Sequence, residues 1–365
     1  MQAHGEIKHI PALDGVRGVA ILLVMFFHLK IPGFSLGWSG VPLFFVLSGF
    51  LITRILIEGR DARLSEYLRV FYLKRTLRIF PLFYAYILVN FIFLLALNRP
   101  TEGYAWYLVY LQNYHIGRQL FEAGNIPGMV AHTWSLAVEE QFYLIWPFII
   151  YFLGRRSLVW VCALLIVVAP ISRYLIVAMS DNVYMANVTL LSCLDMMAYG
   201  ALIAFFSIGH FGARIVYSLF VVGCALLMYS ISKLGLDAFW NPQDWVRYAP
   251  YMFTALAFVF GLPVWLLAND KGKLLARFME FRVFAFTGKI SYGLYVWHFV
   301  LFIVMEKAAL KYPSILSYPV TVLCSLMLAY IVSIASYYLF EVHFLRLKDK
   351  FSQSATVPSL PDATR

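Results

Sequence analysis

The stretch LDGVRGVAILLVMFFHL, residues 13–29, decides the class of fold. Between Arg17 and Lys30 it carries no Asp, Glu, Lys or Arg, which is typical of a helix that crosses a membrane. Comparable apolar runs predict ten spans, at 13–30, 41–57, 80–97, 138–153, 157–179, 189–208, 213–232, 250–268, 289–307 and 317–340. The sequence therefore predicts an all-α membrane protein of about ten transmembrane helices.

The composition of the 365-residue chain agrees with that class. Apolar residues make up 62%, charged residues 13%, and the mean hydropathy is +0.77, whereas a soluble domain is about half apolar and a quarter charged. These values exclude a soluble, a disordered and a disulfide-stapled chain. The four cysteines lie in apolar runs without a C-x-x-C pair, so we interpret them as buried hydrophobes and predict no metal site.

The distribution of basic residues predicts the orientation. With a cytoplasmic N-terminus and an even number of spans, 21 of the 29 Lys and Arg residues fall in the cytoplasm. Both termini are therefore predicted to be cytoplasmic, and the net charge of +10 is attributed to these loops rather than to nucleic-acid binding. No small-x-small cleavage site follows the first helix, so we do not expect a removable signal peptide.

Two connecting segments stand out. Residues 58–79 mix six basic residues with apolar ones, which predicts a helix lying in the cytoplasmic interface. Residues 98–137 form the longest predicted outer loop, which is large enough to cover a cavity. We expect one membrane domain over 1–350 and a short disordered tail over 351–365. We find no internal repeat of the kind on which many transporters are built.

Ionisable residues inside a span are functional candidates because hydrocarbon does not solvate charge. Arg17 and His28 are eleven positions apart, so they share one face of a helix and lie about 16 Å apart along its axis. Asp14 lies close to the same face, where it can pair with Arg17. The alternative is an arginine that reaches back to the interface and a core histidine bonded to a carbonyl.

A second cluster lies in HTWSLAVEEQFYLIWP, residues 132–147. Ser135 followed by Glu139 and Glu140 is also compatible with plain helix-start chemistry. Two adjacent carboxylates entering an apolar run are more than a cap requires. Because adjacent side chains diverge by about 100°, at most one of them faces the same cavity as His28, and we favour Glu139.

Two further motifs carry polar groups. Arg75 and Arg78 share a helix face and present two guanidinium forks, which suit phosphate or diphosphate groups, although lipid head groups would satisfy them equally well. In GKISYGLYVWHF, residues 288–299, Ser291, Tyr295 and His298 form one stripe of a late helix. That stripe predicts either a cavity wall or helix–helix hydrogen bonds.

Taken together and in order, these motifs resemble the acyltransferase 3 family of membrane O-acyltransferases. The resemblance spans residues 9 to 345 approximately and rests on DGVRGVAILLVMFFH, GVPLFFVLSGFLIT, RTLRIFP, TWSLAVEEQFYLIWP and GKISYGLYVWH. It implies transfer of an acyl group, commonly acetyl, from cytoplasmic acyl-CoA to a hydroxyl outside the cytoplasmic membrane of a bacterium. Acceptors in the family include peptidoglycan, other envelope polysaccharides and lipid-linked sugars.

The family's functional positions carry over residue by residue. The family's Arg and His of the first helix match Arg17 and His28, its Arg-x-x-Arg matches Arg75 and Arg78, and its Ser-Gly-Phe begins at Ser48. One departure is that Glu341 is followed by Val and His, where the family often shows Glu-x-Pro. The fused extracytoplasmic esterase-like domain of some members is absent from the sequence, so a later transfer step is expected to need a separate protein.

Acyl transfer requires a base, a bound donor and a place for the acceptor. We predict His28 as the general base, Glu139 as the carboxylate that orients it, and Arg17 as a group that holds the donor or the developing charge. A histidine-borne acyl intermediate is the alternative route. The donor is predicted to bind at Arg75, Arg78, Arg17 and Ser48. The acceptor cavity is predicted to be lined by Glu140, Trp134, Ser135, Tyr292, His298 and Glu341.

The predicted partners are acyl-CoA, a carbohydrate, lipid-linked glycan or other hydroxylated acceptor, and membrane lipids, with the oligomeric state left open. A transporter or flippase of a polar lipid or glycan is the rival function. Such a protein would use the same polar cavity without needing a base.

Overall fold

The computed structural model describes residues 9–123, 129–206, 212–247 and 249–347, and within these ranges every regular element is a helix. The predicted tail at 351–365 lies outside the described residues. The longer helices are α1 (Pro11–His28), α2 (Gly40–Glu58), α3 (Leu64–Ala96), α5 (Gln112–Ala123), α6 (Trp134–Phe152), α7 (Arg155–Ser180), α9 (Leu190–Phe206), α10 (Gly212–Leu234), α12 (Met252–Ala268), α15 (Ser291–Lys311) and α16 (Tyr318–Ser336). Short helices connect them: α4 (Tyr104–Leu108), α8 (Val183–Val188), α11 (Pro242–Val246), α13 (Lys273–Met279) and α14 (Arg282–Lys289).

The all-α membrane class is confirmed. Among the described residues, eight helices are long and apolar enough to cross a membrane, or nine if α12 and α13, bent by 98°, form one broken span. Every predicted span coincides with a helix. The predicted span at 138–153 lies in α6 but is not among these eight, because Glu139, Glu140 and Gln141 make its first half polar.

The basic segment at 58–79 does not form a separate helix, and its place in the cytoplasmic interface stays a prediction. Residues 64–79 form the first half of the 33-residue helix α3, which continues into the third predicted span. At about 1.5 Å per residue such a helix is about 50 Å long, which exceeds a hydrocarbon core of about 30 Å. Four of the six basic residues, Arg69, Lys74, Arg75 and Arg78, therefore lie in the first half of this long helix, and Arg60 and Arg63 precede it. Pro81 is the one helix-breaking residue in α3, and the helix continues through it.

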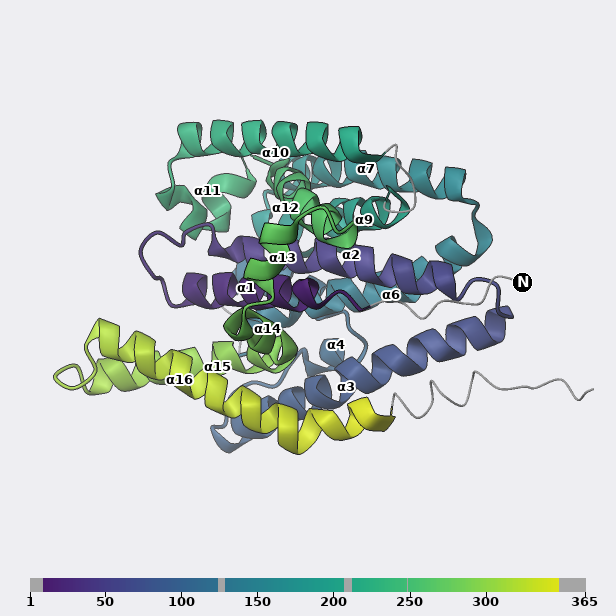
Figure 1. Ribbon diagram of the computed structural model, residues 1–365. Coiled ribbons are helices and arrows are strands. Elements are labelled where there is room, and N and C mark those ends of the chain that lie inside the picture. The colour runs from purple at the N-terminus through teal and green to yellow at the C-terminus, as the bar shows by residue number, and fades with distance from the viewer. Residues whose placement is uncertain (1–8, 124–128, 207–211, 248, 348–365) are drawn as a thin grey trace, which may run out of the picture.

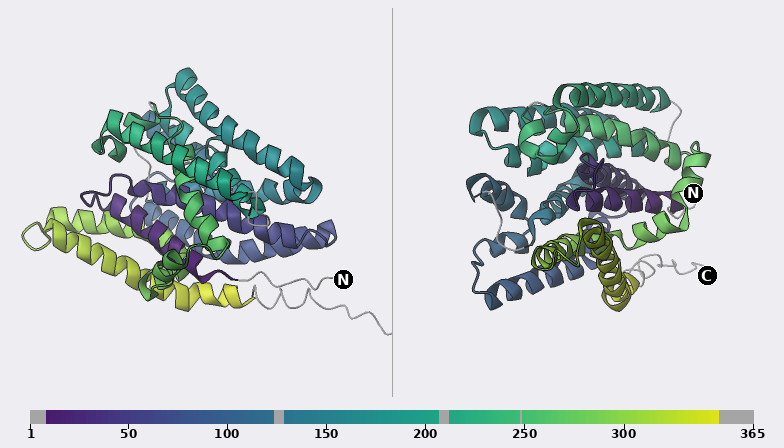
Figure 2. Two further views of the ribbon diagram at one scale, coloured as in Figure 1. Left: turned by 45° about the horizontal axis from the view of Figure 1, so that its top comes forward. Right: turned by 90° about the vertical axis from the view of Figure 1, so that its left-hand side faces the viewer.

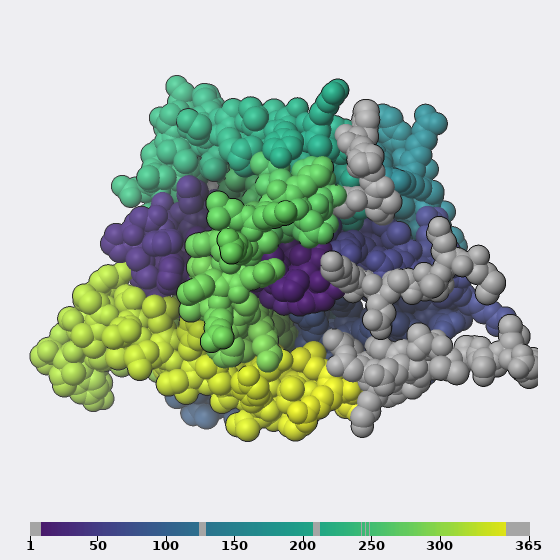
Figure 3. Space-filling view, viewed as in Figure 1, coloured from purple at the N-terminus to yellow at the C-terminus, as the bar shows by residue number. Residues whose placement is uncertain are grey.

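The helices run side by side in layers (Figures 1 and 2). On one side α10 packs on α12 and α7 packs on α9; α1 and α2 run through the middle; α15, α16 and α3 form the opposite side. The start of α1 and the end of the last helical segment lie at the same end of the bundle (Figure 1). Figure 3 shows the green segment of α13 and α14 crossing over α1, where it links the two sides.

Glycines allow two close helix crossings that set the site. A side chain on Gly18 of α1 would overlap the carbonyl oxygen of Phe284 in α14, and one on Gly49 of α2 would overlap that of Met197 in α9. Contact this close requires the absence of a Cβ atom. The DGVRG and SGF motifs therefore bring the backbones next to Arg17 and Ser48 into fixed positions.

Candidate functional site

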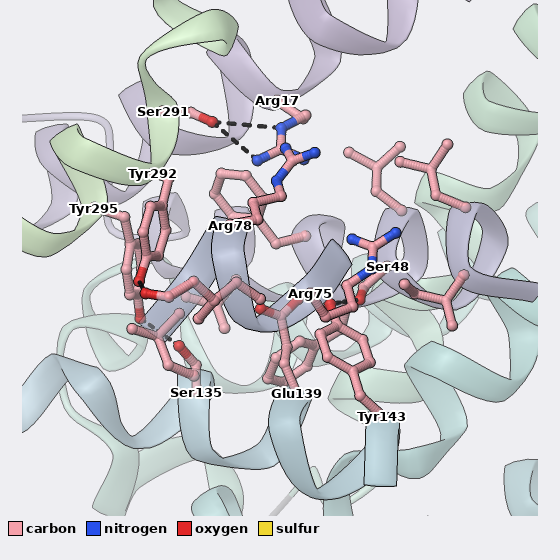
Figure 4. A pocket seen from close by; sticks show the side chains of 18 residues that line it. Arg17, Ser48, Arg75, Arg78, Ser135, Glu139, Tyr143, Ser291, Tyr292 and Tyr295 are labelled. Carbon is pink, nitrogen blue, oxygen red and sulfur yellow. Dashed lines mark hydrogen bonds between the residues drawn. The ribbon is translucent and has the colours of Figure 1, made fainter. Parts of the chain in front are cut away.

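A cavity of about 90 Å³ lies between α1, α2, α3, α6 and α15, and Figure 4 shows the side chains around it. We call it the arginine cavity. Its charged lining comprises three guanidinium groups and one carboxylate, from Arg17, Arg75, Arg78 and Glu139. Its hydroxyl groups come from Ser48, Ser135, Tyr143, Ser291, Tyr292 and Tyr295. The excess of positive charge in a partly enclosed space favours a ligand with anionic groups.

Arg17 is fixed by the late helix α15. Its Nε and one terminal nitrogen donate hydrogen bonds to Ser291 Oγ at 3.4 and 3.3 Å. Asp14 lies within electrostatic range of Arg17, but its carboxylate bonds to His9 Nε2 at 2.9 Å. The predicted Asp14–Arg17 ion pair is therefore replaced by two separate contacts, since Arg17 turns into the bundle while His9 is exposed.

Arg75 and Arg78 both face the arginine cavity, as their i, i+3 spacing predicted. The guanidinium carbon of Arg75 lies 5.7 Å from the ring centroid of Tyr143, a cation–π contact that holds it against α6. Figure 4 shows the side chains of Arg78 and Arg17 close to each other. Two like charges this close repel each other, and an anionic ligand between them would relieve that repulsion.

The two adjacent glutamates occupy different environments, as their helical spacing predicted. Glu139 lines the arginine cavity, where Ser48 Oγ and Tyr143 OH are hydrogen-bonded to each other at 2.5 Å. Glu140 is not among the residues lining that cavity, and in the described part of the chain its Oε1 is buried without a hydrogen-bond partner. Glu140 therefore lies behind the cavity wall rather than in it.

The predicted contact between Glu139 and His28 is wrong. Among the described residues, the hydrogen-bond partner of His28 Nδ1 is His298 Nε2, at 3.0 Å. The reason is that the two residues lie at different heights along the axis of α1. Glu139 lies level with Arg17, near the start of α1, whereas His28 ends that helix about 16 Å further along its axis. The role of either residue in catalysis stays a prediction.

His28 lies between two further cavities. The middle cavity, of about 150 Å³, is lined by His28, Trp134 and His132 among others. The outer cavity, of about 940 Å³, is also lined by His28 and carries the aromatic ring of Trp240 and the carboxylates of Asp237 and Glu306. His28 therefore belongs to the walls of both.

The three cavities follow one another along the bundle. The arginine cavity and the middle cavity share Val41 and Tyr295 in their walls. The middle and outer cavities share Phe27 and His28. The shared lining residues place the three cavities in a row, which leads from the arginine cavity, lined by Arg17, Arg75 and Arg78, to His28 at the end of α1.

Tyr295 forms the partition between the first two cavities. Its hydroxyl donates to the backbone oxygen of His132 at 2.7 Å and is also hydrogen-bonded to Ser135 Oγ. Because the tyrosine proton is used toward His132, Ser135 donates to Tyr295. The stripe of Ser291, Tyr295 and His298 is buried, and each of the three makes a hydrogen bond to another helix. Ser291 and Tyr295 also line the arginine cavity, whereas in the described part of the chain His298 lines none of the three cavities.

The remaining predicted cavity residues divide into two groups. Trp134, Ser135 and Tyr292 line cavities, and the hydroxyl of Tyr292 donates to the backbone oxygen of Ile79 at 2.6 Å. Among the described residues, Glu341 lines none of the three cavities; it ends a π-helical turn, Tyr337–Glu341, and accepts a hydrogen bond from Ser336 at 3.1 Å. The predicted role of Glu341 in the acceptor cavity therefore stays a prediction.

Sequence reasoning missed Tyr143, His132 and the outer-cavity residue Trp240 as lining residues. A signal for Tyr143 existed, since it follows Glu139 by four positions and so shares its helix face. No local signal identifies Trp240, because its short helical turn, Asp237–Trp240, is brought to His28 only by the packing of distant segments.

The fold and the site together define a polytopic helical membrane protein with a buried, cationic polar cavity. The family model described as an acyltransferase domain matches residues 10–338, so the chain belongs to the acyltransferase 3 family.

Several curated proteins are similar to this chain. The peptidoglycan O-acetyltransferase OatA of Listeria monocytogenes is 28% identical over 327 residues, covering 80% of this chain and 49% of that protein. The O-acetyltransferase OatA of Staphylococcus aureus is 27% identical over 323 residues, covering 82% and 52%. The putative peptidoglycan O-acetyltransferase YrhL of Bacillus subtilis is 33% identical over 154 residues, covering 38% and 23%. The chain thus spans about half the length of the first two relatives, and no solved structure matches it.

Proposed function

We propose that this protein is a membrane O-acyltransferase that moves an acyl group, acetyl as in the names of its relatives, from cytoplasmic acyl-CoA to a hydroxyl of an extracytoplasmic carbohydrate or lipid-linked glycan. Membership of the acyltransferase family supports this reaction class over the rival transporter or flippase. The observation that carries the proposal is the row of cavities from Arg17, Arg75 and Arg78 to His28.

The donor is assigned to the arginine cavity. The phosphates of coenzyme A are dianionic groups that match guanidinium forks in geometry and charge. A cavity of about 90 Å³ is too small for the nucleotide, so the nucleotide stays at the cytoplasmic mouth. The narrow pantetheine arm then passes Tyr295 into the middle cavity, which brings the thioester to His28.

The acceptor is assigned to the outer cavity. Its volume of about 940 Å³ accommodates sugar units, since ligand pockets typically measure about 300–1,000 Å³. Trp240 offers an aromatic face to a sugar ring, and the carboxylates of Asp237 and Glu306 can accept hydrogen bonds from sugar hydroxyls. An acceptor hydroxyl that enters this cavity meets His28 at its inner end.

The chemistry at His28 is a single displacement. The imidazole takes the proton of the acceptor hydroxyl while the hydroxyl oxygen bonds to the carbonyl carbon of the thioester. The carbon–sulfur bond then breaks, and the proton passes from the imidazolium to the departing thiolate, which leaves as coenzyme A thiol. The products are the acyl ester and free coenzyme A.

The test uses purified protein in lipid vesicles, with acetyl-CoA carrying a labelled acetyl group and soluble peptidoglycan fragments as the acceptor probe. We expect label on the glycan with wild type and none with His28→Ala, while His343→Ala, at an exposed position far along the chain, keeps the wild-type rate. Turnover of His28→Ala at the wild-type rate would contradict the base. Movement of the glycan across the vesicle without acetylation would support a transporter instead.

The orientation is part of the proposal. We place both termini and residues 58–79 in the cytoplasm, residues 98–137 outside, and the protein in the cytoplasmic membrane, on the charge count of 21 against 8. Single cysteines introduced at these loops and labelled with a membrane-impermeant maleimide would test it. Labelling of 58–79 rather than 98–137 from outside would reverse the orientation and with it the assignment of donor and acceptor sides.

A further inference from the structure

The hydrogen bonds of His298 fix which of its nitrogens carries a proton. Its Nδ1 lies 3.0 Å from the backbone oxygen of Leu294 and 2.8 Å from that of Tyr295. Carbonyl oxygens only accept hydrogen bonds, so Nδ1 must be the protonated, donating atom. His298 is fully buried, and a buried imidazole without a carboxylate partner is neutral. Its Nε2 is therefore an acceptor.

This acceptor determines the state of His28. The 3.0 Å contact joins His298 Nε2 to His28 Nδ1, so His28 Nδ1 must carry a proton and donate it. The neutral His28 ring then has its lone pair on Nε2. Its orientation is held on two sides, by stacking on the His298 ring at 5.0 Å and by an edge contact with Phe299 at 5.2 Å.

We propose that His298 is a positioning residue that holds His28 in the Nδ1-protonated tautomer, which leaves Nε2 as the atom that takes the acceptor proton. The inference rests on the proposed acyltransferase function. It gives a neutral histidine the orienting task that the sequence had suggested for Glu139, which lines the arginine cavity instead.

The arrangement also suits the charged state that forms during transfer. When His28 Nε2 takes the hydroxyl proton, its Nδ1–H bond to His298 Nε2 becomes charge-assisted and therefore stronger. The far side of His298 donates to two backbone oxygens, whose partial negative charge stabilises the positive pair. His132, whose ring lies 5.2 Å from that of His298, donates through Nε2 to the backbone oxygen of Val296 and is not part of this chain of bonds.

Two substitutions separate positioning from packing. His298→Leu keeps an apolar side chain of similar volume but removes the acceptor. His298→Gln keeps an acceptor oxygen toward His28 and an amide donor toward the backbone oxygens. We expect His298→Leu to lower kcat on the order of 10- to 100-fold, below the 10²–10⁴-fold that a general base contributes. The KM values for acetyl-CoA and for the glycan should stay unchanged, and His298→Gln should recover most of kcat.

A spectroscopic readout makes the test direct. In protein labelled with ¹⁵N-histidine and held in lipid nanodiscs, the Nε2 signal of His28, assigned by its loss in His28→Ala, should have the shift of an unprotonated nitrogen. In His298→Leu the His28 signals should move toward those of mixed tautomers. His343→Leu, at an exposed histidine, is the matched control and should change neither kcat nor the His28 signals.

The outcomes separate this inference from the function on which it rests. If His28→Ala is inactive and His298→Leu keeps the wild-type kcat, the positioning role is overturned and the acyltransferase stands. If wild-type His28 shows a protonated Nε2, the tautomer assignment is overturned whatever the kinetics. If wild type acylates none of the acceptors tested, the proposed function fails, and the tautomer is still measured independently by its nitrogen shifts.

Discussion

The ion pair between Arg173 and Asp195 lies deep among α7, α9 and α12, and breaking it is the most quantitative test of the fold. The two side chains are 1% and 0% exposed and meet at 2.7 Å. Arg173 also donates to Thr254 Oγ1 at 2.9 Å and to the backbone oxygens of Pro250 and Ser192. A second contact to Asp195, at 3.3 Å from the other carboxylate oxygen, means that each of the five N–H groups of the guanidinium has an acceptor.

The substitution Asp195→Leu leaves the arginine charge buried without its counter-charge. Breaking a buried pair in this way costs about 3–5 kcal/mol of unfolding free energy. That is on the order of 10²–10⁴-fold in the folding equilibrium, at about 1.4 kcal/mol per factor of ten. Adding Arg173→Met removes the uncompensated charge, so the double variant should be more stable than Asp195→Leu alone.

The measurement is unfolding of the purified protein in mixed micelles with increasing SDS, followed by tryptophan fluorescence. The matched control is the exposed pair Arg118–Glu122, which meets at 2.8 Å with side chains 73% and 54% exposed. Glu122→Ala should cost about 0.3–0.5 kcal/mol. If Asp195→Leu costs no more than Glu122→Ala, or if the double variant is less stable than Asp195→Leu, the electrostatic reasoning is refuted.

Three further predictions concern the site and its scaffold. The double variant Arg75→Ala with Arg78→Ala should raise the KM for acetyl-CoA by at least about tenfold, since each charge-assisted bond is worth about 1.5–3 kcal/mol. The KM for the glycan should change little. An unchanged KM for acetyl-CoA would mean that the pair binds lipid. Glu139→Gln should lower the turnover of folded protein more than Glu140→Gln, because only Glu139 lines the arginine cavity, and the reversed ranking would move the role to Glu140. Gly49→Leu should lower stability in SDS unfolding by about 1–3 kcal/mol, because the new side chain would overlap α9, and wild-type stability would contradict the close crossing.

The sequence by itself determined the class of fold and the helix positions. Hydropathy is a local property, so the apolar runs locate the helices without knowledge of their neighbours. Helical spacing likewise placed Arg75 and Arg78 on one face and separated Glu139 from Glu140, because 3.6 residues per turn applies to any helix. Helical spacing also placed Ser291, Tyr295 and His298 on one stripe, which the sequence predicted to face the interior.

The tertiary structure alone decided which side chains meet. The sequence joined Glu139 to His28, whereas packing of α6 against α2 places Glu139 in the cavity that Arg17 also lines. The partner of His28 comes instead from residue 298, which is 270 positions away. No local pattern encodes such a pairing, because it depends on how distant helices cross, and those crossings are set by glycine contacts such as that of Gly18 with α14. The sequence therefore supplied the chemical groups, and long-range packing arranged them into a site.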